Sequence, residues 1–373
     1  MGKKILVLGV GPSQVDLIEL CNKNNMKVYA CAHEDKGPGR SLVDEFRVID
    51  IKDISAVQEF AKEKQVDYVF TLASEVGVKT MALVSENLGL PHFISSEAAN
   101  ILSNKSKWRS HLGNIEGNLA FMTGKTVSDF KLWDRFPAIL KPIDGSGQRG
   151  VYSVESYLDI EKYFDNSIKF SRLKELILEE MAVGPEVSVN AFMNQGELSF
   201  AIISDRISYK DYPGGIIKEH HIPSKVLSEV GQERVYTLLE KVCKKTGFND
   251  GPVYFQLKIE NDYPKLIEYT PRFDGCHMWR LIKESCGIDL RKVALEWLEH
   301  GFSEILNNYK NKAIDGNYKL IFISDTPGTI VKKEQYFIPD EHEYLEWYYE
   351  EDEKVTPVTG HIEKIGYYIL KEK

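Results

Sequence analysis

The stretch FPAILKPIDGSGQRGV, residues 136–151, joins a strand-like apolar run to a glycine-rich loop. Lys141 closes the run, and Gly145, Gly147 and Gly150 follow it. Glycines let backbone N–H groups approach phosphate oxygens closely, and a lysine ammonium adds a point charge beside them. The order differs from that of a P-loop, in which the lysine follows the glycines. By itself, the stretch fits either a phosphate-binding loop or an ordinary turn between strands.

The composition sets limits on the classes of function. The 373 residues are 43% hydrophobic and 28% charged, which is typical of a globular protein with two or three domains. The net charge of −9 and the lack of a dense basic tract argue against a nucleic-acid partner. No apolar run approaches the roughly 20 residues of a membrane span, and the apolar N-terminal run lacks a cleavage site. We therefore expect a cytoplasmic protein without a membrane partner.

The five cysteines are scattered, odd in number and without a CxxC pair. This usage favours reduced thiols that serve as small core residues, with no structural zinc site. We expect Cys276 to be one of these packed thiols.

The order of apolar patterns predicts the domain organisation. Residues 1–94 alternate strand-like runs with helical segments, as in a parallel sheet covered on both faces. Residues 95–302 are richer in strands, and residues 303–373 form a small strand-rich tail. The acidic, aromatic segment 340–354 is expected to be a solvated edge whose aromatic rings pack inward, with an acidic interaction surface as the alternative. The fold class is therefore α/β and α+β, with a Rossmann-like N-terminal domain, a central body and a small C-terminal domain.

A nicotinamide dinucleotide is one alternative ligand. VLGVGPSQVDLIEL follows a strand and opens a helix, and Glu34 and Asp35 lie near the end of the second strand. The dinucleotide fingerprint needs a third glycine where this chain has Gln14. We therefore interpret the two glycines as packing residues of a doubly wound fold.

Two later segments offer partners for the glycine-rich loop. LILEEMAVGPEVSV, residues 176–189, supplies a connector suited to an adenine edge and a carboxylate, Glu186, suited to ribose hydroxyls. YFQLKI and KLIEYTPR flank an Asn-Asp turn and predict a hairpin. Alternation along its second strand places Glu268, Thr270 and Arg272 on one face.

The hairpin offers hard oxygen ligands. A carboxylate, an amide oxygen and a hydroxyl (Glu268, Gln256 and Thr270) suit Mg²⁺ that also binds phosphate oxygens. Arg272 beside them would neutralise a transferring phosphoryl group. The alternative is a buried salt-bridge network between Glu268 and Arg272.

These motifs, in this order, resemble the ATP-grasp superfamily, and the metal set is similar to that of its carbamoyl-phosphate-synthetase branch and carboxylate–amine ligases. The resemblance covers about residues 1–300 and implies a Rossmann-like domain followed by a two-part ATP-grasp fold. It implies ATP with Mg²⁺ as cofactor, with Mn²⁺ as a substitute, and a mobile lid over the phosphates at residues 144–150.

The resemblance also implies roles for individual residues. The nucleotide-binding residues are Lys105, Lys141, Gly145, Ser146, Gly147, Glu179, Ala182 and Glu186. The metal ligands are Gln256, Glu268 and Thr270, and the catalytic residues are Arg272, Lys141 and Arg206. Thr270 departs from the superfamily's usual asparagine, and its shorter reach would weaken one metal site. Arg206 is a candidate for binding a phosphate or a carboxylate, with a surface ion pair as the alternative.

The implied function is an ATP-dependent ligase that activates a small-molecule carboxylate as an acyl phosphate for attack by an amine. The partners are then the two small molecules, and assembly into a homodimer stays open. The alternatives are a bicarbonate-activating carboxylase similar to carbamoyl-phosphate synthetase, and a nucleotide-binding regulatory module. Both lysines, Gln256, Glu268 and Arg272 are retained, which argues against loss of chemistry. The chain contains no GxSxG or HExxH motif that would suggest another reaction.

Overall fold

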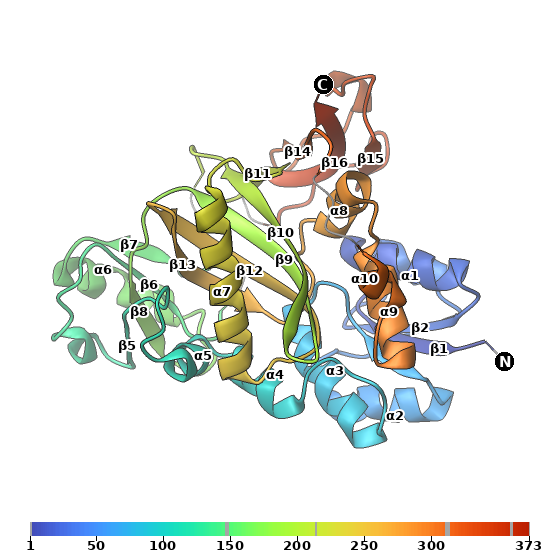
Figure 1. Ribbon diagram of the computed structural model, residues 1–373, viewed down its shortest axis with the longest axis horizontal. Helices are drawn as coiled ribbons and strands as arrows, with labels where there is room; N and C mark the ends of the chain where they lie inside the picture. Colours follow the sequence, from blue (N-terminus) through green and yellow to red (C-terminus); the bar gives the residue numbers. More distant parts are fainter. Residues whose placement is uncertain (1, 146–148, 213–214, 310–313, 359–360, 373) are drawn as a thin grey trace.

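The N-terminal part of the chain forms a parallel sheet with helices packed on it (Figure 1). The computed structural model describes residues 2–145, 149–212, 215–309, 314–358 and 361–372. The parallel sheet has the order β3-β2-β1-β4, with strands β1 (Lys4–Leu8), β2 (Lys27–Ala32), β3 (Glu45–Val48) and β4 (Tyr68–Phe70). Ile5 to Leu8 are fully buried, because a strand covered on both faces needs an uninterrupted apolar run.

The helices of this part begin and end at residues suited to capping. They are α1 (Pro12–Lys23), η1 (Pro38–Leu42), α2 (Ile54–Lys64) and α3 (Glu75–Leu88). The Asp53 and Ser74 side chains accept hydrogen bonds from backbone amides in the first turns of α2 and α3. Gly89 ends α3 in the left-handed conformation, with φ of 66°, where a glycine is favoured.

Gln14 fills the place where a dinucleotide-binding turn has its third glycine. Its side chain is buried, and Oε1 accepts a hydrogen bond from the Leu72 amide at 3.0 Å. The residue thus ties α1 to the chain after β4. This packing role supports the interpretation of the glycine turn as structural.

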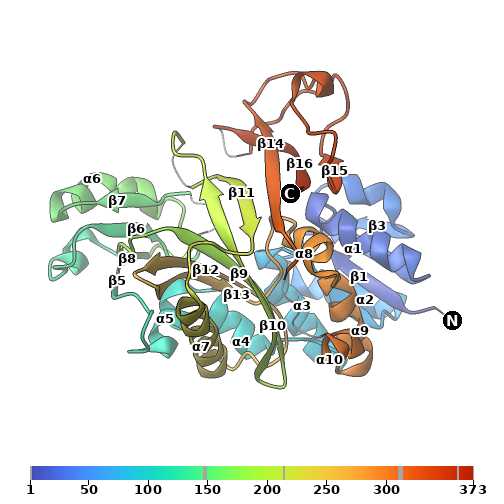
Figure 2. The ribbon, with the colours of Figure 1, turned by 45° about the horizontal axis from the view of Figure 1, so that its top comes forward.

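A second four-stranded sheet, here called the small sheet, forms a lobe at the opposite end of the molecule from the N-terminal sheet (Figures 1 and 2). Its order is β5-β8-β6-β7, with strands β5 (Phe121–Gly124), β8 (Leu176–Glu180), β6 (Ala138–Pro142) and β7 (Tyr152–Val154). The short helix η2 (Val127–Phe130) and helix α6 (Tyr157–Ile168) pack on this sheet, whereas α4 (Ser96–Leu102) and α5 (Lys105–Leu112) pack in the main core of the molecule. Phe130, Leu140 and Leu178 lie in this lobe's own core.

The central sheet is antiparallel throughout and has the order β13-β12-β9-β10-β11-β14-β16-β15. Its first five strands are β13 (Tyr263–Thr270), β12 (Gly251–Glu260), β9 (Glu186–Asn194), β10 (Glu197–Ser208) and β11 (Ile217–Ile222), and helix α7 (Glu229–Thr246) precedes β12. Asn261 and Asp262 both have positive φ, as a two-residue hairpin turn requires. The predicted hairpin is confirmed.

The C-terminal strands extend this central sheet. Strand β14 (Asn317–Asp325) pairs with β11, and β16 (Glu363–Glu372) pairs with both β14 and β15 (Tyr344–Trp347). The remaining elements are α8 (Met278–Cys286), α9 (Leu290–His300), α10 (Glu304–Asn308) and η3 (Lys333–Gln335). Part of the acidic segment thus forms the edge strand β15. The predicted fold class is confirmed, whereas the domain boundaries stay predictions.

None of the helices within the described residues is long and apolar enough to span a membrane.

Asp16 joins α1 to the helices that follow the central sheet. Its side chain is 4% exposed and accepts hydrogen bonds from Trp279 Nε1 at 2.8 Å and Arg291 at 3.0 Å. Arg280 and His277 also contact this carboxylate. Burial alone would raise the pKa of Asp16, but His277 and the two arginines hold it well below its usual range.

Asp16→Asn should lower the free energy of unfolding at neutral pH by about 3 kcal/mol, because Arg280 loses its carboxylate partner and the buried Arg291 keeps only Asp289, while the shape is kept. The folded-state pKa of Asp16 is depressed, so its stabilisation is complete above the unfolded pKa near 4 and is lost as the pH falls toward the folded value. Urea unfolding across this acidic range should therefore show a weaker pH dependence for the variant. Equal stability of the two proteins at neutral pH would contradict this role.

Candidate active site

A buried ionic cluster lies where the small sheet faces α5. Glu179 of β8 accepts hydrogen bonds from Arg109 Nε at 2.7 Å and lies 2.5 Å from Lys141 Nζ of β6. All three side chains are buried. Arg109 also donates to the Leu266 carbonyl of β13 at 2.9 Å, so the cluster connects the small sheet with the central sheet.

The cluster carries one more positive charge than negative charge. Burial alone would raise the pKa of Glu179, but Arg109 and Lys141 hold it at about 2. Burial lowers the pKa of Lys141, and Arg109 and Lys105 lower it further, while Glu179 acts in the opposite direction. Buried charge is costly unless it is compensated. An anion such as a phosphate would therefore be stabilised beside Lys141.

Lys105, at the first turn of α5, reaches the glycine-rich loop. Its Nζ donates to the Gly145 carbonyl at 2.9 Å, and its backbone amide donates to the Ile143 carbonyl at 3.1 Å. The structure thus brings together Lys105, Lys141 and Gly145, as expected for a phosphate-binding end. The predicted Ser146 and Gly147 lie outside the described residues.

The connector between β8 and β9 holds the next predicted residues. Ala182 is half-buried within it. Gly184 has φ of 101°, and a Cβ atom there would lie 2.0 Å from the Ile259 carbonyl oxygen, so only glycine fits. This close approach fixes the connector against β12.

Glu186 contacts protein side chains on the central sheet. Its Oε1 accepts hydrogen bonds from Arg206 of β10 and from Gln256 Nε2 of β12, the latter at 2.5 Å. Arg206 is 8% exposed, so its salt bridge is buried rather than on the surface. The pair connects the expected ribose carboxylate to an expected catalytic arginine, a contact that the sequence did not predict.

The hairpin of β12 and β13 arranges the predicted metal ligands. Gln256 lies directly opposite Glu268, and Tyr254 lies opposite Thr270. Gln256 donates to Glu186 through its amide nitrogen, which leaves its amide oxygen for a cation. Thr270 Oγ1 is buried without a hydrogen-bond partner among the described residues. Gln256, Glu268 and Thr270 thus offer three oxygens that fit Mg²⁺.

Glu268 has no ionic partner among the side chains that the structure describes. Arg272 instead donates to the Phe273 carbonyl at 2.8 Å, and its Nε is buried with no hydrogen-bond partner among the described residues. The alternative interpretation, in which a salt bridge to Arg272 explains Glu268, therefore lacks its main contact. An uncompensated, half-buried carboxylate is better explained by a cation.

Glu75, at the start of α3, is an acidic residue of this site that the sequence analysis missed. Burial raises its pKa, and the Glu268 carboxylate raises it further, while Lys105 and Arg272 act in the opposite direction. The N-terminal domain thus contributes an acid to the metal hairpin. A sequence signal did exist, because Glu75 follows the carboxyl end of a parallel strand, where ligand-binding residues gather.

Beyond Arg206 lies a further buried polar group, here called the acceptor end. It consists of Arg206, His220, Asp274, Cys276 and Lys364, and all but the half-buried Lys364 are buried. Burial raises the pKa of the Cys276 thiol to about 11 and lowers the pKa of the Lys364 ammonium. Lys364 belongs to β16, so the C-terminal strands contribute to this end.

Comparison with known proteins adds independent findings. Residues 134–279 match the ATP-grasp domain. Phosphoribosylamine–glycine ligase of Thermococcus kodakarensis is 25% identical over 297 residues, covering 72% of this chain and 67% of that protein. The structure of phosphoribosylglycinamide synthetase from Anaerococcus prevotii has a TM-score of 0.78 at 19% identity, covering 100% and 94% of the two chains. That of L-amino acid ligase from Bacillus licheniformis has a TM-score of 0.81 at 18% identity, covering 99% and 93%.

Lys141 of the small sheet and Lys105 of α5, together with the oxygen-bearing side chains of the β12–β13 hairpin, suit a nucleotide and a divalent cation. The match over residues 134–279 and the similar proteins place the chain among ATP-grasp proteins. The superfamily and the enzyme class predicted from the motifs, an ADP-forming ligase, are confirmed by these matches. The roles of the individual residues stay proposals.

Lys141→Ala should weaken ATP binding at least about tenfold, because it removes the charge that makes the buried cluster attractive to phosphate. Isothermal titration with the non-hydrolysable analogue AMP-PNP measures the change. Lys131→Ala, at an exposed lysine outside the cluster, is the matched control and should bind like the parent. Unchanged affinity in Lys141→Ala would contradict the assignment of the loop.

Glu75→Gln should stabilise the nucleotide-free, metal-free protein at neutral pH by up to about 1 kcal/mol, because it removes repulsion from Glu268. The folded-state pKa of Glu75 is raised, so stability is lost as the pH rises from about 4 through that value. The variant cannot ionise at this position, so it does not lose this stability as the pH rises. At about pH 4 its free energy of unfolding should equal that of the parent.

Thermal unfolding at neutral pH and at about pH 4 tests this effect of Glu75. The exposed Glu59→Gln is the control. The gain should shrink in a Glu268→Gln background, because the two carboxylates then no longer repel. An equal gain in both backgrounds would show that Glu268 is not the cause.

Proposed function

We propose that the chain uses ATP and Mg²⁺ to join a small-molecule carboxylate to an amine. The observation that carries the proposal is Glu268, a half-buried carboxylate that has no ionic partner in the described part of the chain and lies opposite Gln256. Mg²⁺ bound there would hold the terminal phosphates near the excess positive charge at Lys141 and Lys105. ATP-grasp enzymes use this combination of ATP and Mg²⁺.

The reaction takes place in two displacements. A carboxylate oxygen attacks the γ-phosphorus of ATP, the bond from that phosphorus to the bridging oxygen breaks, and ADP and an acyl phosphate result. The amine then attacks the acyl carbon, inorganic phosphate leaves, and the amine releases a proton. Such phosphoryl transfer depends mainly on positioning and on neutralisation of charge.

The chain's own residues divide this work. Lys105 and Lys141 neutralise the phosphate oxygens, and Arg272, whose Nε has no partner within the described residues, is placed to stabilise the transferring group. Arg206 is held by Glu186 and orients the carboxylate substrate. Glu75, whose pKa is raised, is placed to accept a hydrogen bond from the amine.

An amino acid is the proposed carboxylate substrate. The name of the T. kodakarensis relative contains glycine, and the B. licheniformis enzyme is an L-amino acid ligase. The acceptor end supports this class, because its cations Arg206 and Lys364 suit a carboxylate. Bicarbonate is the carboxylate of the alternative carboxylase reaction.

Release of ADP tests the proposal. Amino acids, other small carboxylates and bicarbonate are supplied with and without a set of amines, in the presence of Mg-ATP. ADP formation should depend on both a carboxylate and an amine. Turnover with bicarbonate alone would favour the carboxylase, and nucleotide binding without turnover on any pair would favour a regulatory module.

Glu268→Gln should reduce ADP formation by at least about a hundredfold, because the charge that binds the metal is lost. The melting temperature of the metal-free variant should equal or exceed that of the parent, because the shape is kept and the repulsion from Glu75 is relieved. Glu260→Gln, at an exposed glutamate of the same hairpin, is the matched control and should retain activity. Full activity of Glu268→Gln with a lowered melting temperature would overturn the metal assignment.

A further inference from the structure

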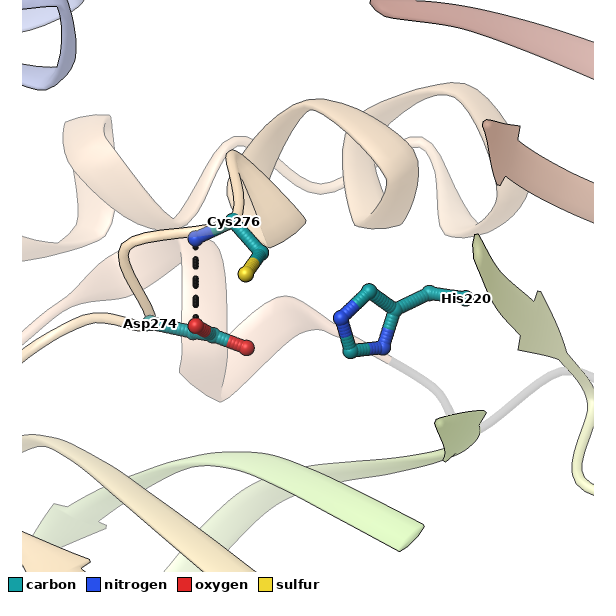
Figure 3. A group of neighbouring side chains, drawn as sticks. All are labelled: His220, Asp274 and Cys276. Carbon is teal, nitrogen blue, oxygen red and sulfur yellow. Dashed lines mark hydrogen bonds between the residues drawn. The ribbon is translucent and has the colours of Figure 1, made fainter. Parts of the chain in front are cut away.

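Three buried side chains of the acceptor end converge on one point (Figure 3). His220 comes from β11, and Asp274 and Cys276 come from the segment between β13 and α8. Their exposed fractions are 0%, 4% and 6%, and their potential ligand atoms all lie within 4.8 Å of one another. In Figure 3 the imidazole points toward the sulfur and the carboxylate.

Two of these side chains have ligand atoms without a partner. Asp274 Oδ1 accepts a hydrogen bond from the Cys276 amide at 3.1 Å, whereas Oδ2 has no partner among the described residues. His220 Nε2 is likewise buried and unpartnered within the described structure. Buried polar atoms nearly always find partners, so two unpartnered atoms at one point indicate a missing ligand.

Ser204 sets the chemical state of His220. The Ser204 hydroxyl donates to the Ser188 carbonyl at 3.4 Å and lies 3.2 Å from His220 Nδ1. Since its only proton is directed to the carbonyl, the hydroxyl accepts from Nδ1–H. The lone pair of the imidazole is then on Nε2, which faces the cluster. This arrangement, with the second ring nitrogen held by a hydrogen bond, is typical of histidines that bind metals.

We propose that His220 Nε2, Asp274 Oδ2 and Cys276 Sγ form a three-ligand site for Zn²⁺ or a similar borderline divalent cation. Imidazole nitrogen, carboxylate oxygen and thiolate sulfur are all zinc ligands, and three protein ligands leave a fourth position for water or a substrate atom. In a tetrahedral site the ligand atoms lie about 3.5 Å apart, so modest side-chain movement closes the set. On binding, the thiol proton passes to solvent and the sulfur binds as thiolate.

The site differs in chemistry from the Mg²⁺ ligands of the hairpin. Gln256, Glu268 and Thr270 offer only oxygen, which suits hard cations, whereas the cluster includes sulfur and imidazole nitrogen. Binding of a borderline metal does not depend on the ligase reaction. The two assignments therefore fail or succeed separately.

Two cations of the acceptor end compete with a bound metal. The charge of Arg206 is compensated by Glu186. Lys364 is the stronger competitor, because its Nζ lies 3.7 Å from Cys276 Sγ and it has no carboxylate within salt-bridge distance among the described side chains. A dication at the sulfur repels this ammonium, so removing the lysine charge should strengthen metal binding.

Titration of the 373-residue chain with Co²⁺, after EDTA has removed bound metal ions, tests the proposal. One equivalent of Co²⁺ should bind. The bound ion should give the visible absorption of a tetrahedral site and a sulfur-to-cobalt charge-transfer band in the near ultraviolet. Cys276→Ser should lose the charge-transfer band, and Asp274→Asn should bind Co²⁺ at least about tenfold more weakly. Cys286→Ser, at a half-buried thiol outside the cluster, should retain the band.

Two further variants make the test specific. Lys364→Met should bind Co²⁺ at least about tenfold more tightly than the parent, because the competing charge is gone. Glu268→Gln should keep the charge-transfer band, which separates this site from the proposed Mg²⁺ site. Circular dichroism confirms that each variant is folded, and Asp274→Asn decides the matter if Cys276→Ser does not fold.

The proposal is overturned if the parent shows no sulfur-to-cobalt band or if the band survives in Cys276→Ser. An affinity of Lys364→Met for Co²⁺ that is no higher than that of the parent would also overturn the proposal.

Discussion

Arg109 holds the two sheets of the candidate site in one arrangement. It is fully buried and donates both to Glu179 of the small sheet and to the Leu266 carbonyl of the central sheet. A buried guanidinium must have its donors satisfied, and its planar geometry fixes the directions in which its partners lie. The same carboxylate binds Lys141, so the position of this lysine depends on Arg109. The spacing between the two sheets, and with it the distance from Lys141 to the β12–β13 hairpin, follows from this contact.

Charge changes in sign along the candidate site. The end with Lys141 and Lys105 has excess positive charge, whereas Glu75 and Glu268 place two carboxylates that repel each other at the hairpin. A ligand that combines phosphates with a divalent cation matches both regions at once, because each component neutralises one of them. Protein contacts compensate the charge of neither region fully. Such uncompensated charge is typical of ligand-binding sites.

The local patterns of the sequence predicted much of this structure. The alternation of apolar runs predicted the parallel sheet, the Asn-Asp turn predicted the hairpin, and the motif order predicted the superfamily. These features depend on neighbouring residues, so they can be read from short segments. The place of Gln256 opposite Glu268 also followed from the hairpin, although the irregular register after Gln256 did not.

Contacts between distant segments could not be predicted in the same way. Arg206 was expected near a substrate or at the surface, yet it lies buried against Glu186, because β9 and β10 are neighbours in the sheet. Glu75 reaches the hairpin only through the packing of the N-terminal domain. The unpartnered atoms of His220 and Asp274 likewise depend on the packing of β11 against the segment after β13. Sequence spacing carries no information on these contacts, although the place of Glu75 after a parallel strand indicated a ligand-binding edge.

The pairing order of the strands in the central sheet also affects when each part of the candidate site can form during synthesis. Lys364 reaches Cys276 across 88 positions of sequence, and its strand β16 is held by β14, which in turn pairs with β11. On the ribosome the nucleotide-binding segments emerge long before this strand, so the growing chain can form its ATP-binding part while the acceptor end is still incomplete. Pairings between such distant segments are slow to form. Competence to bind nucleotide should therefore precede completion of the acceptor end during biosynthesis.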